Sequence, residues 1–276
     1  DYFQDLTANV QAALKEDMGT GDLTADLIPK SRQARATVIT NEAAVICGRP
    51  WFDGVLQAVD ATIEITWLVS EGQAVDAGTL ICELRGSAQS ILTAERSALN
   101  FLQTLSGTAT ETQHYVAALK QSHTQLLDTR KTLPGLRLAQ KYAVHCGGGK
   151  NHRIGLYDAI LIKENHIMAA DGIQNAVQKA KQRHPNTTIE VETENLDEVQ
   201  QAVHANADII MLDNFAIEAI KQAVEWVNGR CLLEVSGNVE LTSLINLAQT
   251  GVDYVSTGAI TKHLHAIDFS MRFHLE

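Results

Sequence analysis

The sequence has little that would suit an extracellular or membrane protein. Its 276 residues include only four cysteines, which lie far apart and form no CxxC pair. This spacing excludes a disulfide framework and a structural zinc site of the usual kind. No apolar run is long enough to span a bilayer, and no signal-peptide pattern opens the sequence. We therefore expect a cytoplasmic protein that has no membrane partner.

Positive charge is also scarce over most of the chain. The sequence has 22 Lys and Arg against 33 Asp and Glu, so its net charge is −11 and its pI is about 5.3. This balance argues against a nucleic-acid partner. The exception is the segment 128–166, which begins near TRKTLPGLR and holds seven of the 22 cations. A basic pocket inside an acidic protein favours a small polyanion as its ligand.

The first part of the sequence predicts an α+β unit that ends near residue 95. Apolar residues at helical spacing predict a helix over 2–18. Stretches rich in β-branched residues predict strands, with a short helix at 50–60 between the first two. A long helical pattern at 94–119 leads into the second part. The predicted strands lie within 34–48, 62–69 and 78–86.

The second part alternates apolar strands with helices, which predicts parallel βα units. No GxGxxG fingerprint follows the first strand, so a barrel or incomplete barrel is favoured over an open dinucleotide-binding sheet. The sequence leaves open whether a seventh strand lies in the glycine-rich segment 143–155. The six clear strand candidates are 125–129, 157–163, 188–193, 207–213, 231–236 and 252–257.

Polar residues or glycine turns follow every one of these six strands. In a β/α barrel the carboxyl ends of the strands carry the chemistry. Glu192 stands inside an apolar run, where an inward carboxylate needs a partner, and Lys163 follows mostly apolar residues. We therefore expect one shared site at the strand ends. Its expected residues are Thr129, Arg130, Lys131, Lys163, Glu192, Asp213, Ser236, Gly237, Asn238, Thr257, Gly258 and Ala259.

The last two strands carry a second signal. Each ends in a small residue and a glycine just before a helix, as in EVSGN and VSTGAIT. Backbone amides at such helix starts bind phosphate, because they point at the ligand and the helix dipole favours negative charge. The carboxylates of Glu192 and Asp213 would then serve sugar hydroxyls or Mg²⁺. A phosphorylated sugar joined to an acidic partner fits the phosphate-binding turns, the two carboxylates and the basic segment 128–166.

Several long segments, in one order, resemble the quinolinate phosphoribosyltransferase family, whose members are also called carboxylating nicotinate-nucleotide pyrophosphorylases. The resemblance covers nearly the whole chain. It implies an N-terminal α/β sandwich at 1–99, an incomplete β/α barrel of about seven strands at 100–266, and a tail at 267–276 that returns to the first domain. The segments are EDMGTGDLT, AERSALNFLQTLSGTAT, TRKTLPGLR, NHRIGLYDAILIKENH, EVETEN, MLDN and EVSGN.

The resemblance also implies the reaction. Quinolinate and phosphoribosyl pyrophosphate (PRPP) would give nicotinate mononucleotide, pyrophosphate and CO₂, a step of de novo NAD biosynthesis. It implies Mg²⁺, held mainly through the substrate with Glu192 and Asp213 as candidate direct ligands. It further implies a homodimer with shared active sites, and a higher oligomer stays open.

The roles of individual residues follow from the same resemblance. Lys163, Glu192 and Asp213 are expected to be catalytic. Quinolinate, a planar dicarboxylate, is expected to bind the forked guanidinium groups and their neighbours. Its residues would be Thr129, Arg130, Lys131, His152 and Arg153, with Arg96 supplied by the partner subunit. PRPP would bind Lys131, Lys163, Glu192, Asp213, Ser236, Gly237, Asn238, Thr257, Gly258 and Ala259.

Four alternatives are weighed against this interpretation. The first is a phosphoribosyltransferase for a related pyridine carboxylate, and the second is a Schiff-base aldolase that uses Lys163. The aldolase leaves the basic segment without a role. The third is a biotinyl or lipoyl carrier module in VSEGQAVDAGTLICEL, but the residues that follow offer no lysine for attachment. The fourth is a metal site at His145, Cys146 and His152, whose spacing fits no common pattern.

Overall fold

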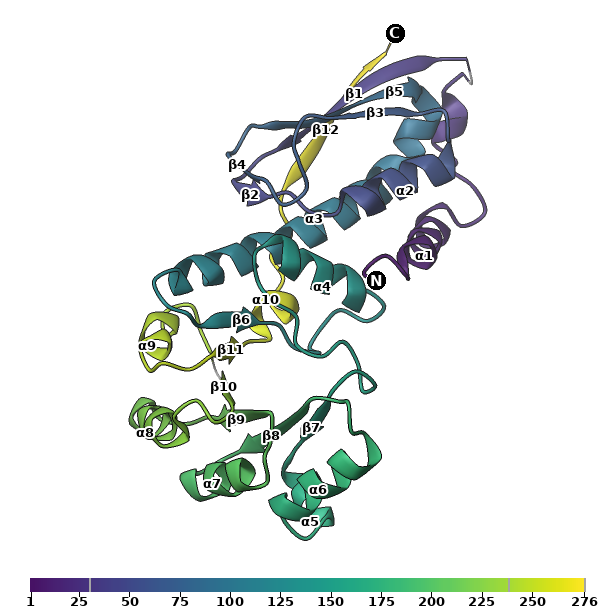
Figure 1. Cartoon of the computed structure of the whole chain (residues 1–276). Coiled ribbons are helices and arrows are strands. Elements are labelled where there is room, and N and C mark those ends of the chain that lie inside the picture. Colours follow the sequence, from purple (N-terminus) through teal and green to yellow (C-terminus); the bar gives the residue numbers. More distant parts are fainter. Residues whose placement is uncertain (30, 238, 276) are drawn as a thin grey trace. The chain divides into compact units, whose positions relative to one another are not determined.

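The computed structural model describes residues 1–29, 31–237 and 239–275. The chain forms two compact units (Figure 1). We call residues 1–113, 132–148 and 263–276 the N-terminal unit, and residues 114–131 and 149–262 the barrel unit. Each unit therefore takes more than one segment of the chain.

The N-terminal unit is built on a four-stranded sheet in the order β12-β1-β5-β3. β1 pairs antiparallel with both β12 and β5. β2 and β4, each two residues long, pair antiparallel in a separate small sheet. Their bounds are β1 (Gln33–Thr40), β2 (Ala44–Val45), β3 (Glu64–Trp67), β4 (Ala74–Val75), β5 (Leu80–Ser87) and β12 (Phe269–Leu275).

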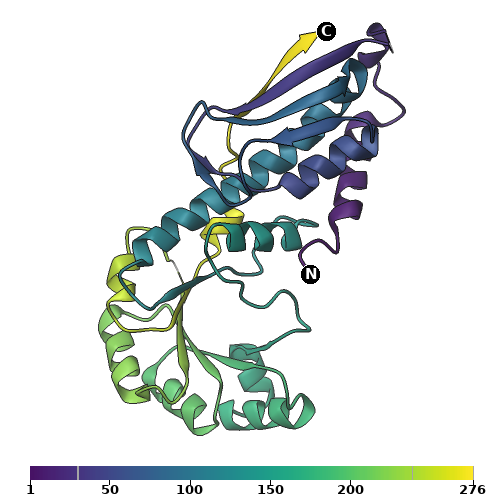
Figure 2. The ribbon, with the colours of Figure 1, turned by 45° about the horizontal axis from the view of Figure 1, so that its top comes forward.

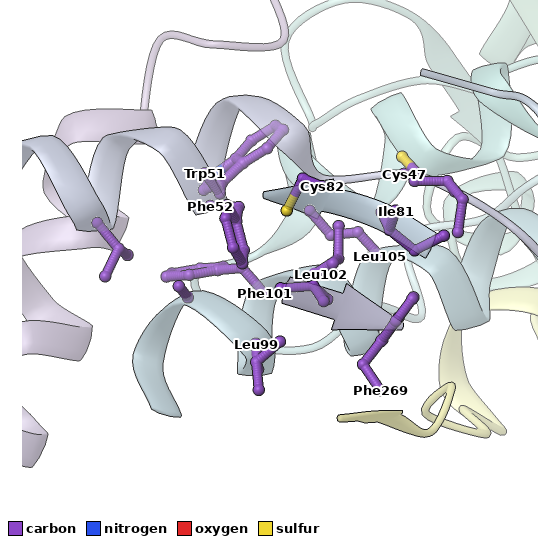
Figure 3. Packing of buried hydrophobic residues seen from close by; sticks show 14 of the residues in the cluster. Cys47, Trp51, Phe52, Ile81, Cys82, Leu99, Phe101, Leu102, Leu105 and Phe269 are labelled. Atoms are coloured by element: carbon purple, nitrogen blue, oxygen red, sulfur yellow. The ribbon is translucent and has the colours of Figure 1, made fainter. Parts of the chain in front are cut away.

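Helices α2 and α3 lie along one side of this sheet (Figures 1 and 2). Alternate residues of β1 are buried, as period-2 strands require, and they meet the apolar faces of these helices. Trp51, Phe52, Leu102 and Leu105 are fully buried in the shared core (Figure 3). The helices and the short 3₁₀ turn of this unit are α1 (Leu6–Met18), η1 (Ala25–Leu27), α2 (Arg49–Val59), α3 (Ala88–Leu119, of which residues 114–119 belong to the barrel unit) and α4 (Arg137–Cys146).

Helix α4 belongs to the N-terminal unit although it lies between two barrel strands in the sequence. Its buried residues Ala139 and Ala143 join the same core as α2 and α3. The tail joins it as well, through Ile267 and Phe269. The predicted division at residues 99 and 100 falls inside α3, and the predicted tail, 267–276, contains β12.

The barrel unit contains a parallel six-stranded sheet in the order β6-β11-β10-β9-β8-β7. Helices α5 to α9 follow the outer side of the curved sheet (Figures 1 and 2). The strands are β6 (Gln125–Leu127), β7 (Ile160–Ile162), β8 (Ile189–Thr193), β9 (Ile209–Asp213), β10 (Leu232–Ser236) and β11 (Tyr254–Ser256). The helices are α5 (Glu164–Ala169), α6 (Ile173–Arg183), α7 (Leu196–His204), α8 (Ile217–Val227), α9 (Leu244–Ala248) and α10 (Ala259–Lys262).

The six predicted strands and the mixed α/β fold class are confirmed. The glycine-rich segment that left a seventh strand open contributes one isolated bridge, Lys150 to Leu127. Three consecutive glycines precede Lys150 and offer no side chains to pack on a sheet. β6 and β7 therefore stay at the two ends of the sheet, and the barrel is incomplete.

None of the helices in the described ranges combines the length and apolar character that crossing a bilayer requires.

Candidate active site

Two arginines of the basic segment lie close together in the barrel unit. Arg130 follows β6, and Arg153 lies in the loop before β7; both are half-buried. Burial lowers the pKa of Arg153, and the positive charge of Arg130 lowers it further. Two neighbouring cations that are partly shielded from solvent repel each other, so a bound anion between them would lower the energy of the pair. The pair is suited to a carboxylate, which guanidinium groups bind through two parallel hydrogen bonds.

A buried aspartate fixes the loop that carries Arg153. Asp128, at the end of β6, is fully buried. Its Oδ1 accepts the backbone N–H of His152 at 2.8 Å, and its Oδ2 accepts the Asn151 side-chain amide at 2.8 Å. Asp158 similarly accepts two backbone amides later in the loop. The carboxylates thus hold the loop in place at the carboxyl end of β6, where the arginines meet.

The side chain of His152 points toward two buried glutamates. Its Nε2 lies 2.8 Å from Oε2 of Glu190 on β8 and 3.5 Å from Oε2 of Glu234 on β10. Its Nδ1 accepts the backbone N–H of Arg153 at 2.7 Å, so the ring proton is on Nε2. Burial raises the pKa of Glu234 to about 8, and the negative charge of Glu190 contributes to the rise. At neutral pH the Glu190–Glu234 pair therefore carries one proton more than two ionised glutamates would.

A second cluster combines a lysine and two carboxylates. Lys163, which follows β7, forms an ion pair with Glu192 on β8. Burial raises the pKa of Asp213 at the end of β9, and the charge of Glu192 raises it further, whereas Lys163 and Lys131 lower it. Asn214 donates to Asp213 Oδ2 at 2.8 Å. These oxygens are half-buried and are of the type that Mg²⁺ and sugar hydroxyls prefer, so the residues present fit that metal.

The turns after β10 and β11 approach neighbouring strand ends closely. A side chain at Gly237, whose φ is +97°, would meet Asn214 Oδ1 at 2.1 Å. A side chain at Gly258 would meet Lys131 Cδ at 2.9 Å and Thr129 Oγ1 at 3.3 Å. Only glycine fits at the first position, because space and backbone conformation both exclude a Cβ. The Gly258 turn thus lies against Lys131 and Thr129, which are expected to bind substrate, and the Gly237 turn lies against Asn214, the neighbour of Asp213.

Some of the backbone amides expected to bind phosphate already donate hydrogen bonds within the protein. The N–H of Thr257 donates to Leu127 O at 3.1 Å, and the N–H of Ala259 donates to the Thr257 hydroxyl at 3.1 Å. Ser236 ends β10 and is half-buried. Asn238 lies outside the described residues.

Arg96 is the one predicted site residue that lies in the N-terminal unit. It is exposed on α3, next to Glu95. The other described site residues belong to the barrel unit, at the carboxyl ends of its strands. Cys146 and His152, weighed together as metal ligands from the sequence, belong to different groups: Cys146 lies with Cys47 and Glu71, and His152 with Glu190 and Glu234.

Sequence reasoning missed three buried acids that support the site: Asp128, Glu190 and Glu234. A signal for the glutamates was present, because each interrupts an apolar strand in the runs TIEVET and LLEVS. A charged residue at an inward position of a buried strand requires a partner. That partner, His152, could not be identified from its position in the sequence.

The chain was compared with known proteins. Residues 22–106 match the family described as quinolinate phosphoribosyl transferase, N-terminal domain, and residues 108–272 match its C-terminal domain. The probable carboxylating nicotinate-nucleotide pyrophosphorylase of Synechocystis is 42% identical over 95% of this chain and 90% of that protein. The chloroplastic carboxylating enzyme of Arabidopsis thaliana is 39% identical over 99% of this chain and 84% of that protein.

Solved structures agree with these matches. The nicotinate-nucleotide pyrophosphorylase of Francisella tularensis superposes with a TM-score of 0.96 at 54% identity, covering 98% of this chain and 96% of that one. A second structure, NadC from Streptococcus pyogenes, gives a TM-score of 0.96 at 40% identity and covers 100% and 98% of the two chains. The chain described here belongs to the quinolinate phosphoribosyltransferase family.

Proposed function

We propose that this chain transfers the phosphoribosyl group of PRPP to quinolinate, with loss of pyrophosphate and CO₂, and so supplies nicotinate mononucleotide to NAD biosynthesis. The observation that carries the proposal is the half-buried pair Arg130 and Arg153 at the same sheet edge as Lys163, Glu192 and Asp213. A dicarboxylate needs the first group, and a phosphorylated ribose needs the second. The family names point to the same reaction.

Quinolinate would bind with its carboxylates on the two guanidinium groups. Thr129 and Lys131 lie beside Arg130, and the Thr129 hydroxyl already accepts the Lys131 N–H at 3.1 Å. His152 would act mainly by position, since its ring is held against Glu190 and Glu234 and its backbone N–H against Asp128. The ring nitrogen of the substrate would then be oriented toward the ribose.

PRPP would bind at the neighbouring strand ends. Glu192 and Asp213 would accept the ribose hydroxyls and stabilise positive charge at the anomeric carbon as pyrophosphate leaves. Lys163 and Lys131 would neutralise the departing phosphates. Mg²⁺, held through the substrate and by Glu192 or Asp213, would supply further charge neutralisation. The turns containing Gly237 and Gly258 would accommodate the 5′-phosphate, with Ser236 and Asn238 on one turn and Thr257 and Ala259 on the other.

The loss of CO₂ demands little of the protein. Once the ring nitrogen carries the ribose, the pyridinium accepts the electrons left by the carboxylate on the adjacent carbon. Residues that keep the substrate in place are then sufficient. Four free cysteines and an acidic surface suit the cytoplasm, where we place the reaction.

We further propose a homodimer in which Arg96 completes the partner's site. Arg96 is exposed on α3 and remote in sequence from the strand ends. Arg96→Ala and Lys163→Ala homodimers should each be inactive. Mixing them with subunit exchange should restore one complete site in each heterodimer. If mass spectrometry shows exchange and activity does not return, Arg96 does not act across subunits.

Substrate choice tests the proposed reaction. The purified protein is incubated with PRPP, Mg²⁺ and either quinolinate or nicotinate, and the nucleotide product is quantified. We expect nicotinate mononucleotide from quinolinate and little from nicotinate, because a monocarboxylate engages only one arginine of the pair. Comparable product from nicotinate would favour the related alternative, a transferase for monocarboxylates.

A further inference from the structure

A group of three side chains in the N-terminal unit has no role in the proposed reaction. Cys47 precedes α2, Glu71 lies in the loop before β4, and Cys146 is the last residue of α4. Their ligand-type atoms all lie within 4.8 Å of one another. The residues are far apart in sequence, so the fold alone brings the two thiols together.

The backbone around this group is well fixed. The Cys47 N–H donates to the Ser106 hydroxyl at 3.0 Å, and that hydroxyl donates back to Cys47 O at 3.1 Å. Glu71 accepts the amides of Gly48 and Arg49 at the start of α2, at 2.7 and 3.3 Å. A Cβ added at Gly72 would lie 3.4 Å from Cys146 O, so the end of α4 passes beside this loop.

We propose that Cys47 and Cys146 are an oxidisable pair that forms a disulfide when the protein meets a peroxide. The two sulfur atoms lie within 4.8 Å of each other. A disulfide bond requires about 2.05 Å between them, so they must close by less than about 3 Å. Cys146 ends its helix and is half-buried, which leaves its side chain room to turn.

The environments of the two sulfurs differ in the way that such a reaction needs. The pKa of Cys146 is lowered chiefly because the Cys47 thiol donates to its sulfur, and Tyr142 donates as well. Burial raises the pKa of Cys47, which is fully inaccessible. Cys146 is therefore the more accessible and the more acidic of the two thiols, whereas Cys47 is buried (Figure 3 shows Cys47 within the core).

The reaction balances with hydrogen peroxide as the oxidant. The Cys146 thiolate attacks one peroxide oxygen, an S–O bond forms, the O–O bond breaks and hydroxide leaves. The Cys47 sulfur then attacks the sulfenic sulfur, the S–S bond forms, and the S–O oxygen leaves as water with the Cys47 proton. Glu71, whose carboxylate has an oxygen within 4.8 Å of both sulfurs, is placed to pass that proton on. Two electrons pass from the thiols to the peroxide.

A bound metal is the competing interpretation of the same group. Structural zinc sites usually present four sulfur or nitrogen ligands, whereas this group has two sulfurs and one carboxylate. Both oxygens of Glu71 already accept backbone amides that start α2. The two adjacent thiols therefore favour oxidation over metal binding.

The test is peptide mapping of the wild-type protein, before and after dilute hydrogen peroxide, under non-reducing conditions. We expect a linked peptide containing Cys47 and Cys146, loss of two hydrogens in intact mass, and full reversal by dithiothreitol. Cys231 is the internal control, since it is also half-buried but burial raises its pKa to about 11. Cys146 should react about tenfold faster, because its thiolate is more populated and this advantage is partly offset by lower nucleophilicity.

Three variants extend the test. In Cys47→Ala the sulfenic acid on Cys146 should persist and be trapped by dimedone, whereas Cys146→Ala should give no adduct on Cys47. Cys231→Ser should form the Cys47–Cys146 bond as the wild-type does. The proposal is overturned if wild-type Cys146 ends as sulfinic acid without a link to Cys47, or if it reacts no faster than Cys231. It is also overturned if the purified protein holds stoichiometric zinc that shields both thiols.

Discussion

Replacing Glu234 with Gln should remove a pH dependence of stability that this buried carboxyl imposes. Burial raises its pKa from the usual 4.5 to about 8. Between these values the unfolded chain has released the proton while the folded chain still holds it. The free energy of unfolding of the wild-type protein therefore falls as pH rises through this window. From about pH 5 to about pH 8 the fall amounts to as much as about 4 kcal/mol, at roughly 1.4 kcal/mol per pKa unit.

The Gln variant keeps the shape of the protonated carboxyl but cannot ionise. The amide has nearly the same shape as the protonated carboxyl and, like it, offers Glu190 a hydrogen-bond donor, so the packing of the pair is preserved. We expect the variant to gain stability relative to the wild-type as pH rises, with the largest gain near pH 8. His152 reduces the effect, because a positive charge there would favour ionised Glu234.

Urea unfolding followed by circular dichroism at several pH values measures this difference. Glu225→Gln is the matched control: Glu225 is exposed on α8, so its curve should stay parallel to that of the wild-type. If the curves of Glu234→Gln and the wild-type are also parallel, Glu234 ionises normally in the folded protein. The interpretation of the buried glutamate pair would then be wrong.

Three further predictions concern the reaction. Arg153→Ala should weaken quinolinate binding by about 2–5 kcal/mol, because it leaves a substrate carboxylate unpaired. Calorimetry should show no loss of quinolinate affinity for the exposed control Arg183→Ala. If the Kd for quinolinate is unchanged in both variants, Arg153 does not belong to the pocket. Asp213→Asn should lower kcat while KM for PRPP changes little, because the charge of Asp213 matters most when the ribose becomes cationic. If steady-state kinetics show a change in KM alone, Asp213 contributes to substrate binding and not to the chemical step. Gly237→Ala should raise KM for PRPP, since its Cβ would meet Asn214 Oδ1 at 2.1 Å, and unchanged saturation would place the phosphate elsewhere.

The sequence predicted most of the barrel because its signals are local. Six apolar strands alternate with helices, and each strand was located within a few residues of its observed bounds. The strand ends also predicted Lys163, Glu192 and Asp213 as neighbours, since parallel strands bring their carboxyl ends to one edge. The ion pair between Lys163 and Glu192 and the influence of Glu192 on Asp213 are consistent with that expectation.

Features that depend on packing between distant segments could not be predicted. The pattern of α4 indicated a helix, but nothing local assigned Ala139 and Ala143 to the core of the N-terminal unit. The Glu190–Glu234 pair likewise depends on β8 and β10 flanking β9. The meeting of Cys47 with Cys146 requires the end of α4 to pack beside the segment before α2, which no spacing in the sequence encodes.

The fate of the quinolinate carboxylate at ring position two tests the central claim most directly. Quinolinate labelled at that carboxylate is incubated with the protein, PRPP and Mg²⁺, and the labelled CO₂ and the nucleotide are measured together. The account predicts one labelled CO₂ for each nicotinate mononucleotide, and none when PRPP is omitted. Nucleotide that retains the label, or label released without PRPP, would contradict it.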